Sequence, residues 1–344
     1  MTIVDALLKL GAVLVISWIG VNKLRVYSAL LIIVPLFTLS FLLIYCRQFP
    51  ECKLSKSFDK SLFKNLLSLS GWNFLGNITF SLVHEGVNML LNVFGGLVYN
   101  AARTVSYQVK SVASQVTSNT IISARPKIMQ RAAVDDKPIV FRNINSISRV
   151  AFFTILLPVC IILSYTEQLL DIWLVDVPEG AVLFTRLLLV SIVVRSLHDP
   201  LNMLYMSYAK IKRMMIVEAV TMFFFFLVIY ASLKMGAPIW IPFAEIIVME
   251  ACIIIGLLIN ANHELGFSIE VYVKDVVGPF ILLSLITGLL CSVFARFVVV
   301  NGTMDTLLKC VLVGVVYMAV AYLLLNKQEK GLLFHLVGRF LIKH

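Results

Sequence analysis

Two consecutive segments of this very apolar chain carry polar side chains at helical spacing. Steps of three and four residues place such side chains on one face of a helix. Because a polar face is costly against hydrocarbon, we expect both faces to point into a helix bundle or a water-filled cavity, as the lining of a substrate path does. The stripe on residues 66–93 comprises Asn73, Asn77, Ser81, His84, Glu85, Asn88 and Asn92, and the stripe on residues 98–124 comprises Arg103, Tyr107, Lys110, Ser114 and Thr117.

The second stripe holds two cations, Arg103 and Lys110, which lie two helical turns apart and are therefore nearly aligned. Lys110 is too far from either end of its segment to reach the membrane surface easily, whereas Arg103 is nearer one end. Fixed cations in a cavity favour an anionic group such as a phosphate. The alternative interpretation is that both cations reach an interface or pair with a carboxylate.

Glu85 and the asparagines on its stripe have several possible roles. Glu85 could neutralise Arg103 or Lys110, bind a coupling cation or proton, or serve as a structural hydrogen-bonding group. The asparagines Asn73, Asn77, Asn88 and Asn92 could hydrogen-bond a sugar or bridge helices, and the sequence does not decide between these roles.

A second group of charges lies on residues 181–208. Arg195 and Asp199 are four residues apart and can pair on one helix face. Pro200 removes a backbone hydrogen bond, so a kink beside this pair would make a hinge for alternating access. A purely structural ion pair is the alternative. The further carboxylates Glu218, Glu245 and Glu250 lie at uncertain depth and have a weaker case for function.

The composition identifies the class of protein. The chain is 60% hydrophobic and 14% charged, whereas soluble domains have roughly 45–50% apolar and about 25% charged residues. The net charge of +10 comes from short basic loops between apolar segments, which is typical of cytoplasmic loops and not of a nucleic-acid-binding face. Six scattered cysteines show no metal-ligand spacing, and no catalytic motif is present. We therefore predict an all-α polytopic membrane protein that is not an enzyme and needs no cofactor or metal.

About ten segments are long and apolar enough to span a bilayer. The basic loops alternate consistently along the chain, which places both termini in the cytoplasm. The longest cytoplasmic loops are expected at 47–65, with a basic amphipathic stretch, and at 125–146. The predicted spans are 3–21, 27–46, 66–93, 98–124, 147–170, 181–208, 213–234, 238–261, 276–299 and 305–326.

Several blocks of this sequence resemble the bacterial polysaccharide, or O-antigen, flippases. The blocks are LSGWNFLGN at 69–77, EGVNMLLNVFG at 85–95, YNAAR at 99–103, YQV at 107–109 and RPKI at 125–128. This family lies within the multidrug, oligosaccharidyl-lipid and polysaccharide exporter superfamily. The resemblance implies two six-helix bundles that face each other across a cavity, with two extra C-terminal helices.

On this resemblance, the chain is the later part of a two-bundle alternating-access transporter. Residues 1–46 align with the fifth and sixth helices of the family, so we expect an N-terminal truncation. The implied domains are 1–46 at the end of the N-terminal bundle, 47–65 as an amphipathic loop, 66–262 as the C-terminal six-helix bundle, 263–326 as two additional helices, and 327–344 as a basic cytoplasmic tail.

The implied function is translocation of undecaprenyl-diphosphate-linked oligosaccharide across the bacterial inner membrane for lipopolysaccharide O-antigen or capsule. Arg103 carries over from the family motif as a ligand of the diphosphate, and Lys110 is supported by its position. The implied partners are the lipid-linked oligosaccharide, membrane lipids, a polysaccharide polymerase and glycosyltransferases. Two alternatives stay open: an organic-cation antiporter of the same fold class, and a non-transporting scaffold of polysaccharide assembly.

Overall fold

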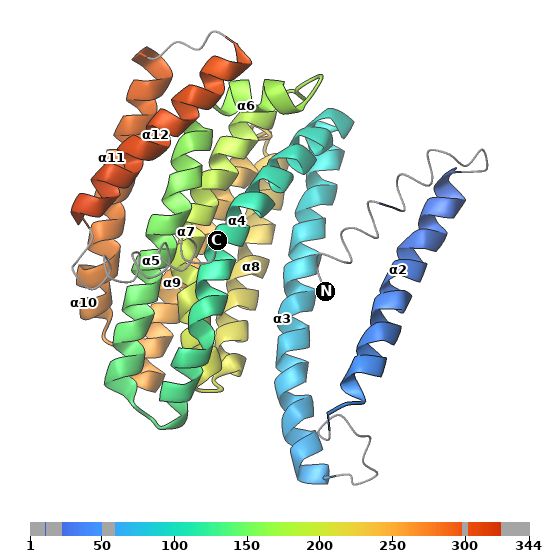
Figure 1. Cartoon of the computed structure of the whole chain (residues 1–344), viewed down its shortest axis with the longest axis vertical. Coiled ribbons are helices and arrows are strands. Elements are labelled where there is room, and N and C mark those ends of the chain that lie inside the picture. The colour runs from blue at the N-terminus through green and yellow to red at the C-terminus, as the bar shows by residue number, and fades with distance from the viewer. Residues whose placement is uncertain (1–10, 12–22, 50–58, 298–301, 325–344) are drawn as a thin grey trace. The chain divides into compact units, whose positions relative to one another are not determined.

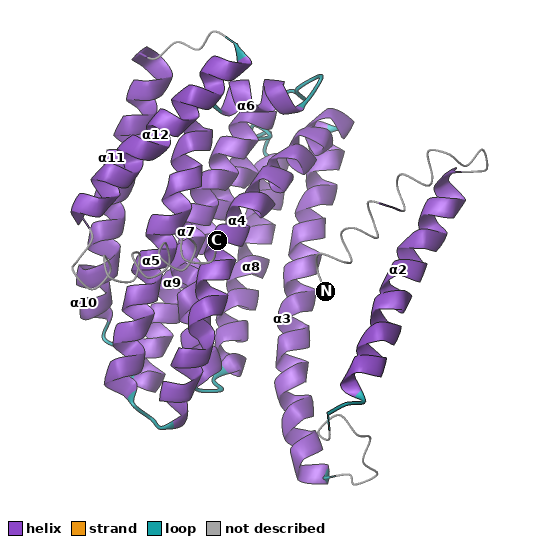
Figure 2. Ribbon diagram, viewed as in Figure 1, coloured by secondary structure: helices purple, strands orange, loops and turns teal. Residues whose placement is uncertain are grey.

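The described part of the chain is built from helices alone. The computed structural model describes residues 11, 23–49, 59–297 and 302–324, and within these ranges it contains helices and turns but no strand (Figures 1 and 2). Two compact units divide the chain, Met1–Lys64 and Asn65–His344. The helices are α2 (Lys23–Cys46), α3 (Lys60–Gly95), α4 (Leu97–Ala133), α5 (Lys137–Ser164), α6 (Thr166–Trp173), α7 (Ala181–Ser207), α8 (Ile211–Lys234), α9 (Ile241–Leu265), α10 (Ile269–Tyr272), the π-helix η2 (Val273–Val277), α11 (Gly278–Phe297) and α12 (Thr303–Leu324).

Six helical stretches among the described residues are long and apolar enough to cross a membrane. They are α5, α7, α8, α9, α12 and the continuous stretch that runs from α10 through η2 into α11. This architecture is consistent with the predicted polytopic membrane protein. The two helices that carry the polar stripes, α3 and α4, are not among the six. The count of ten spans therefore stays a prediction, and the span predicted at 3–21 lies almost entirely outside the described residues, as does the tail at 327–344.

The segment predicted as a loop at 125–146 is almost entirely helical, so the prediction of a loop is wrong, whereas its cytoplasmic location stays a prediction. Helix α4 continues to Ala133 and α5 begins at Lys137, which leaves only residues 134–136 between them. Asp136 caps α5, because its carboxylate accepts a hydrogen bond from the backbone N–H of Ile139 at 3.4 Å. Hydropathy shows where a segment becomes polar and not where its helix ends, and both helices continue through the polar residues.

The predicted loop at 47–65 is only partly described, since residues 50–58 lie outside the described ranges. Its last residues are helical, because α3 begins at Lys60. The carboxylate of Asp59 accepts hydrogen bonds from the backbone N–H groups of Ser61 and Leu62 at 2.8 and 3.1 Å, which is the pattern of an N-cap. The segment predicted as one span at 147–170 is divided at Tyr165, where α5 ends and the short α6 follows.

Helix α7 forms the centre of the unit that begins at Asn65. It packs against α4, α5, α8 and α9, and it has the largest buried share of the six apolar stretches. Buried tyrosines connect neighbouring helices through hydrogen bonds to backbone carbonyl groups. The Tyr205 hydroxyl of α7 donates to the Leu257 carbonyl of α9 at 2.7 Å, and the Tyr317 hydroxyl of α12 donates to the Phe153 carbonyl of α5 at 2.7 Å. Such bonds satisfy the phenol and fix the register between helices.

Two glycines of α3 lie against side chains of α8. A Cβ atom placed on Gly86 would lie 2.7 Å from the Phe226 ring, and one on Gly76 would collide with the Met215 side chain. Val87 and Leu91 of α3 then join a buried cluster with Ile229 of α8. This packing turns the centre of α3 toward α4 and α8, and it sets the position of the first polar stripe.

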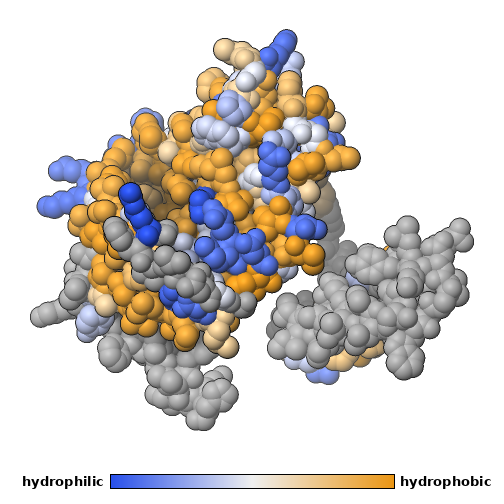
Figure 3. All heavy atoms as spheres, turned by 90° about the horizontal axis from the view of Figure 1, so that it is seen from above, coloured by the Kyte–Doolittle hydropathy of each residue, from blue (hydrophilic) through white to orange (hydrophobic). Residues whose placement is uncertain are grey.

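The outer surface of this unit is largely apolar. Large hydrophobic side chains on α8, α11 and α12 are exposed, among them Phe223, Phe224, Leu285 and Val311. In Figure 3, hydrophobic residues cover most of the visible surface of the helical body. A surface of this kind is costly in water and suits contact with lipid chains.

Two cysteines provide a test of the packing between α5 and α11. The Sγ atoms of Cys160 and Cys291 are 3.3 Å apart and both residues are buried. A disulfide needs about 2.05 Å between its sulfur atoms, so only a small shift would join them. We expect diamide treatment of the purified protein to form an intramolecular disulfide, measured as a cross-linked peptide pair by mass spectrometry.

The variant Cys160→Ser is the control for this cross-link and should leave Cys291 alkylatable after unfolding. Full alkylation of both thiols in the oxidised native protein would contradict the arrangement of α5 and α11.

Candidate functional site

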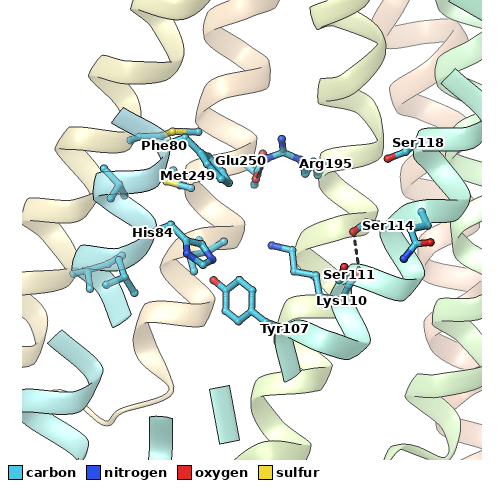
Figure 4. A pocket seen from close by; sticks show the side chains of 16 residues that line it. Phe80, His84, Tyr107, Lys110, Ser111, Ser114, Ser118, Arg195, Met249 and Glu250 are labelled. Atoms are coloured by element: carbon cyan, nitrogen blue, oxygen red, sulfur yellow. Dashed lines mark hydrogen bonds and ion pairs between the residues drawn. The ribbon is translucent and has the colours of Figure 1, made fainter. Parts of the chain in front are cut away.

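A cavity of about 430 Å³ opens between α3, α4, α7, α8 and α9. Its volume lies within the range of about 300–1,000 Å³ that is usual for ligand sites. Figure 4 shows that polar groups converge on it from α3, α4, α7 and α9. Its lining consists of Phe80, Val83, His84, Val87, Tyr107, Lys110, Ser111, Ser114, Gln115, Ser118, Arg195, Met222, Ile229, Ile246, Met249 and Glu250.

Lys110 extends from α4 into this cavity. Its ammonium group points into the space between the His84 and Tyr107 rings and the Arg195–Glu250 pair (Figure 4). Its Nζ atom is 5.3 Å from the centroid of the Tyr107 ring, and within the described part of the chain it makes no hydrogen bond or ion pair. A cation that lines a cavity and lacks a direct partner is available to an anionic ligand.

A chain of charged side chains lies across the cavity from Lys110, buried at His198 and Glu250 and half-buried at Arg195 and Asp199. Arg195 Nη1 of α7 is 2.9 Å from Glu250 Oε1 of α9, and Arg195 Nε is 3.6 Å from Asp199 Oδ1 one turn along α7. His198 Nε2 of α7 is 2.9 Å from Glu218 Oε1 of α8. These contacts tie α7, α8 and α9 together deep in the bundle.

The contact between His198 and Glu250 closes this chain of charges. Their Nδ1 and Oε2 atoms are 3.2 Å apart, which is an ionic contact, although the angles are not those of a hydrogen bond. Both side chains are almost fully buried, where an isolated charge would be far more costly than a paired one. Glu250 is therefore shared between Arg195 and His198.

The balance of charge in the cavity is positive. Among its lining residues, Lys110 and Arg195 are cations and Glu250 is an anion, and the ion pair of the last two leaves Lys110 in excess. Low-dielectric walls strengthen the attraction of such a charge for an anion. The arrangement can hold a phosphate or carboxylate group, with hydroxyl and amide groups of α4 beside it.

Of the residues predicted for substrate binding, the structure brings Tyr107 and Lys110 into the cavity, and it adds Arg195 from the predicted ion pair. The predicted pair of Arg195 with Asp199 is present, but the shorter contact of Arg195 is to Glu250. Helix α7 continues through Pro200 to Ser207.

Arg103 does not line the cavity. It is only 6% exposed, and its Nη2 donates to the His84 carbonyl at 3.2 Å. Its guanidinium carbon lies 4.4 Å from the centroid of the Tyr107 ring. Arg103 thus contacts two residues that line the cavity, His84 and Tyr107, without lining it itself. The substrate-binding role expected from the family motif stays a prediction.

Glu85 and the asparagines of the first stripe lie away from the cavity lining. The Glu85 side chain is 66% exposed, accepts a hydrogen bond from Asn88 at 3.3 Å and lies 3.5 Å from His84. In the described structure it forms no ion pair with Arg103 or Lys110. The Asn77 side chain donates to the Asn73 carbonyl, and Asn92 is exposed. Their proposed contacts with sugars stay predictions.

The main additions of the structure to the site are Glu250, His198 and Glu218. Their only signal in the sequence was a charge within an apolar helix, which favours an interior partner. Helix α4 also contributes a polar set that sequence reasoning passed over, Ser111, Gln115 and Ser118. These three follow one another at steps of four and three residues, and this spacing was the signal that could have identified them.

No model of a known protein family matches this chain, and neither the curated proteins nor the solved structures include a match. The class is therefore defined by the structure itself: over its described residues the protein is helical, with six apolar stretches suited to a membrane and a cavity lined by Lys110 among its helices.

The buried contact of Glu250 with Arg195 predicts an unequal effect of two glutamate substitutions. Glu250→Gln leaves Arg195 without its closest partner, so we expect a loss of stability near the lower end of ~3–5 kcal/mol. Glu167→Gln removes an exposed pair with Arg186 at 3.5 Å and should cost at most about 1 kcal/mol.

Thermal unfolding in detergent, followed by tryptophan fluorescence, compares these two variants. The double variant Arg195→Met with Glu250→Met should recover only part of the loss, because Asp199 then lacks Arg195 while His198 keeps Glu218. Equal melting temperatures for Glu250→Gln and Glu167→Gln would contradict the stabilising role of the buried pair.

Proposed function

We propose that this chain translocates a lipid-linked oligosaccharide, attached to undecaprenyl through a diphosphate, across the bacterial inner membrane for O-antigen or capsule synthesis. The observation that carries the proposal is the ammonium group of Lys110, which lies in a polar cavity without a direct partner among the described residues. A diphosphate is the anionic group of such a lipid, and a fixed cation inside a low-dielectric protein attracts it.

The shape of the cavity supports a substrate that has both a polar head and an apolar tail. Phe80 lines the cavity although it is 46% exposed, so the cavity reaches the outer surface of the unit beside an apolar side chain. A head group held at Lys110 could then extend its polyprenyl chain past Phe80 into the bilayer. The tail would never leave hydrocarbon, which removes the largest cost of moving such a lipid.

The proposed mechanism is alternating access. The diphosphate would bind at Lys110 from the cytoplasmic side, and a change in helix arrangement would then open the cavity to the periplasmic side. Both termini would be cytoplasmic, as would the basic residues Arg125, Lys127 and Arg131 at the end of α4. Pro200, one residue beyond Asp199 on α7, is the proposed hinge.

The charges in the cavity favour this proposal over an organic-cation antiporter. Binding an organic cation requires a carboxylate that the protein does not already neutralise. The cavity carboxylate is Glu250, and it contacts Arg195 at 2.9 Å and His198 at 3.2 Å. A scaffold without transport activity would not need Lys110 to face a cavity.

Replacing Lys110 tests the proposal directly. In a host deleted for its own copy, Lys110→Gln should lower surface polysaccharide at least tenfold at unchanged protein abundance, since a charge-assisted hydrogen bond contributes about 1.5–3 kcal/mol. Undecaprenyl-diphosphate-linked oligosaccharide should accumulate, measured by mass spectrometry of extracted lipids.

Lys127→Gln is the matched control, because Lys127 lies on the same helix but is exposed and outside the cavity lining. It should support normal export. Arg103 is left intact in this test, since its substitution would also disturb His84 and Tyr107. Normal export by Lys110→Gln would refute the proposed function.

A further inference from the structure

A second cavity of about 320 Å³ adjoins the first. The two share Arg195, Ser114 and Ser118 in their linings, so they form two lobes that meet at these side chains. The second lobe lies between the later parts of α4 and α7. Its full lining is Ser114, Thr117, Ser118, Ile121, Ile122, Ile192, Arg195, Ser196 and Asp199.

Thr117 is the most informative residue of the second lobe. It is 4% exposed, and its hydroxyl has no hydrogen-bond partner among the described residues. A buried hydroxyl without a partner costs about 1–3 kcal/mol, and native proteins rarely retain such a group without a reason. A ligand group in the lobe would supply the missing hydrogen bond.

The other polar groups of this lobe offer both acceptors and donors. The Ser114 hydroxyl donates to the Lys110 carbonyl at 2.8 Å, and the Ser196 hydroxyl donates to the Val193 carbonyl at 2.6 Å. Since these hydrogens are occupied, both oxygens present lone pairs that can accept. The Asp199 carboxylate also accepts, whereas Arg195 donates.

The charge and the walls of this lobe distinguish it from the first. Arg195 lies 3.6 Å from Asp199 and 2.9 Å from Glu250, so its one charge is shared between two carboxylates and this lobe has no excess cation. Ile121, Ile122 and Ile192 form its apolar part. A ligand that fits offers hydroxyl groups to Thr117 and Asp199 and C–H groups to the isoleucines, and this combination describes a sugar ring.

We propose that the second lobe binds the sugar unit next to the diphosphate, with Thr117 and Ser118 donating to the ring and Asp199 accepting from its hydroxyls. The proposal rests on the proposed function, because it places the diphosphate at Lys110 in the first lobe. Arg195 then stands at the junction of phosphate and sugar. Both lobes use one continuous face of α4, so a single helix positions the head group.

Binding of two lipids to the purified protein tests this assignment. The first probe is lipid-linked oligosaccharide extracted from the source strain, and the second is undecaprenyl diphosphate, which has no sugar. The variant Thr117→Val with Ser118→Ala should bind the first probe about tenfold more weakly, since two hydrogen bonds of about 0.5–1.5 kcal/mol each are lost. Its affinity for undecaprenyl diphosphate should equal that of the unaltered protein.

Thr120→Val with Ser123→Ala is the matched control on the same helix. Both hydroxyls donate to backbone carbonyls and neither lines a lobe, so this variant should bind both probes normally. Should the double variant in the lobe fail to fold, Ser118→Ala alone serves, because Ser118 is exposed. Its loss for the oligosaccharide lipid should then be about threefold.

The outcomes separate the sugar site from the proposed function. Unchanged affinity of the lobe variants for the oligosaccharide lipid overturns the sugar site and leaves the diphosphate at Lys110 in place. Selective weakening of that lipid by these variants, without any effect of Lys110→Gln on either probe, supports the sugar site and overturns the role of Lys110. Failure of the unaltered protein to bind either lipid overturns both.

Discussion

The contact between Arg195 and Glu250 is the interaction on which the arrangement of this bundle depends. An arginine in the middle of an apolar helix must find an anionic partner inside the protein, because hydrocarbon offers none. Glu250 supplies it from α9 at 2.9 Å, and His198 and Glu218 extend the contact to α8. Three helices are thereby fixed in rotation as well as in position, which apolar packing alone specifies less strictly.

This buried pair also determines what the neighbouring cavity can do. With Glu250 occupied by Arg195 and His198, the ammonium group of Lys110 keeps its charge for something that is not part of the described chain. Arg103, in contrast, already has partners within the protein, because it contacts the His84 carbonyl and the Tyr107 ring. Two cations on one helix thus acquire different roles. The proposed division of the cavity into a phosphate lobe and a sugar lobe follows from the same arrangement.

The helices divide the tasks of stability and recognition. Helix α7 supplies the buried centre, and tyrosines such as Tyr205 and Tyr317 bind neighbouring helices to one another. Helices α3 and α4 are more polar, and α4 contributes more of the cavity lining than any other helix. A rigid apolar scaffold that carries polar groups on one face can hold them at fixed distances, as a specific binding site requires.

By itself, the sequence determined the helical membrane class, the position of most helices and the polar faces, because these follow from hydropathy and from the period of a single helix. It also predicted the contact of Arg195 with Asp199, since both lie on one helix. The partnership of Arg195 with Glu250, the burial of Arg103 and the helical extensions that replaced the loop at 125–146 were decided by tertiary structure. Each depends on how separate helices rotate and pack, or on where a helix ends beyond the apolar core, and a pattern within one segment contains neither piece of information.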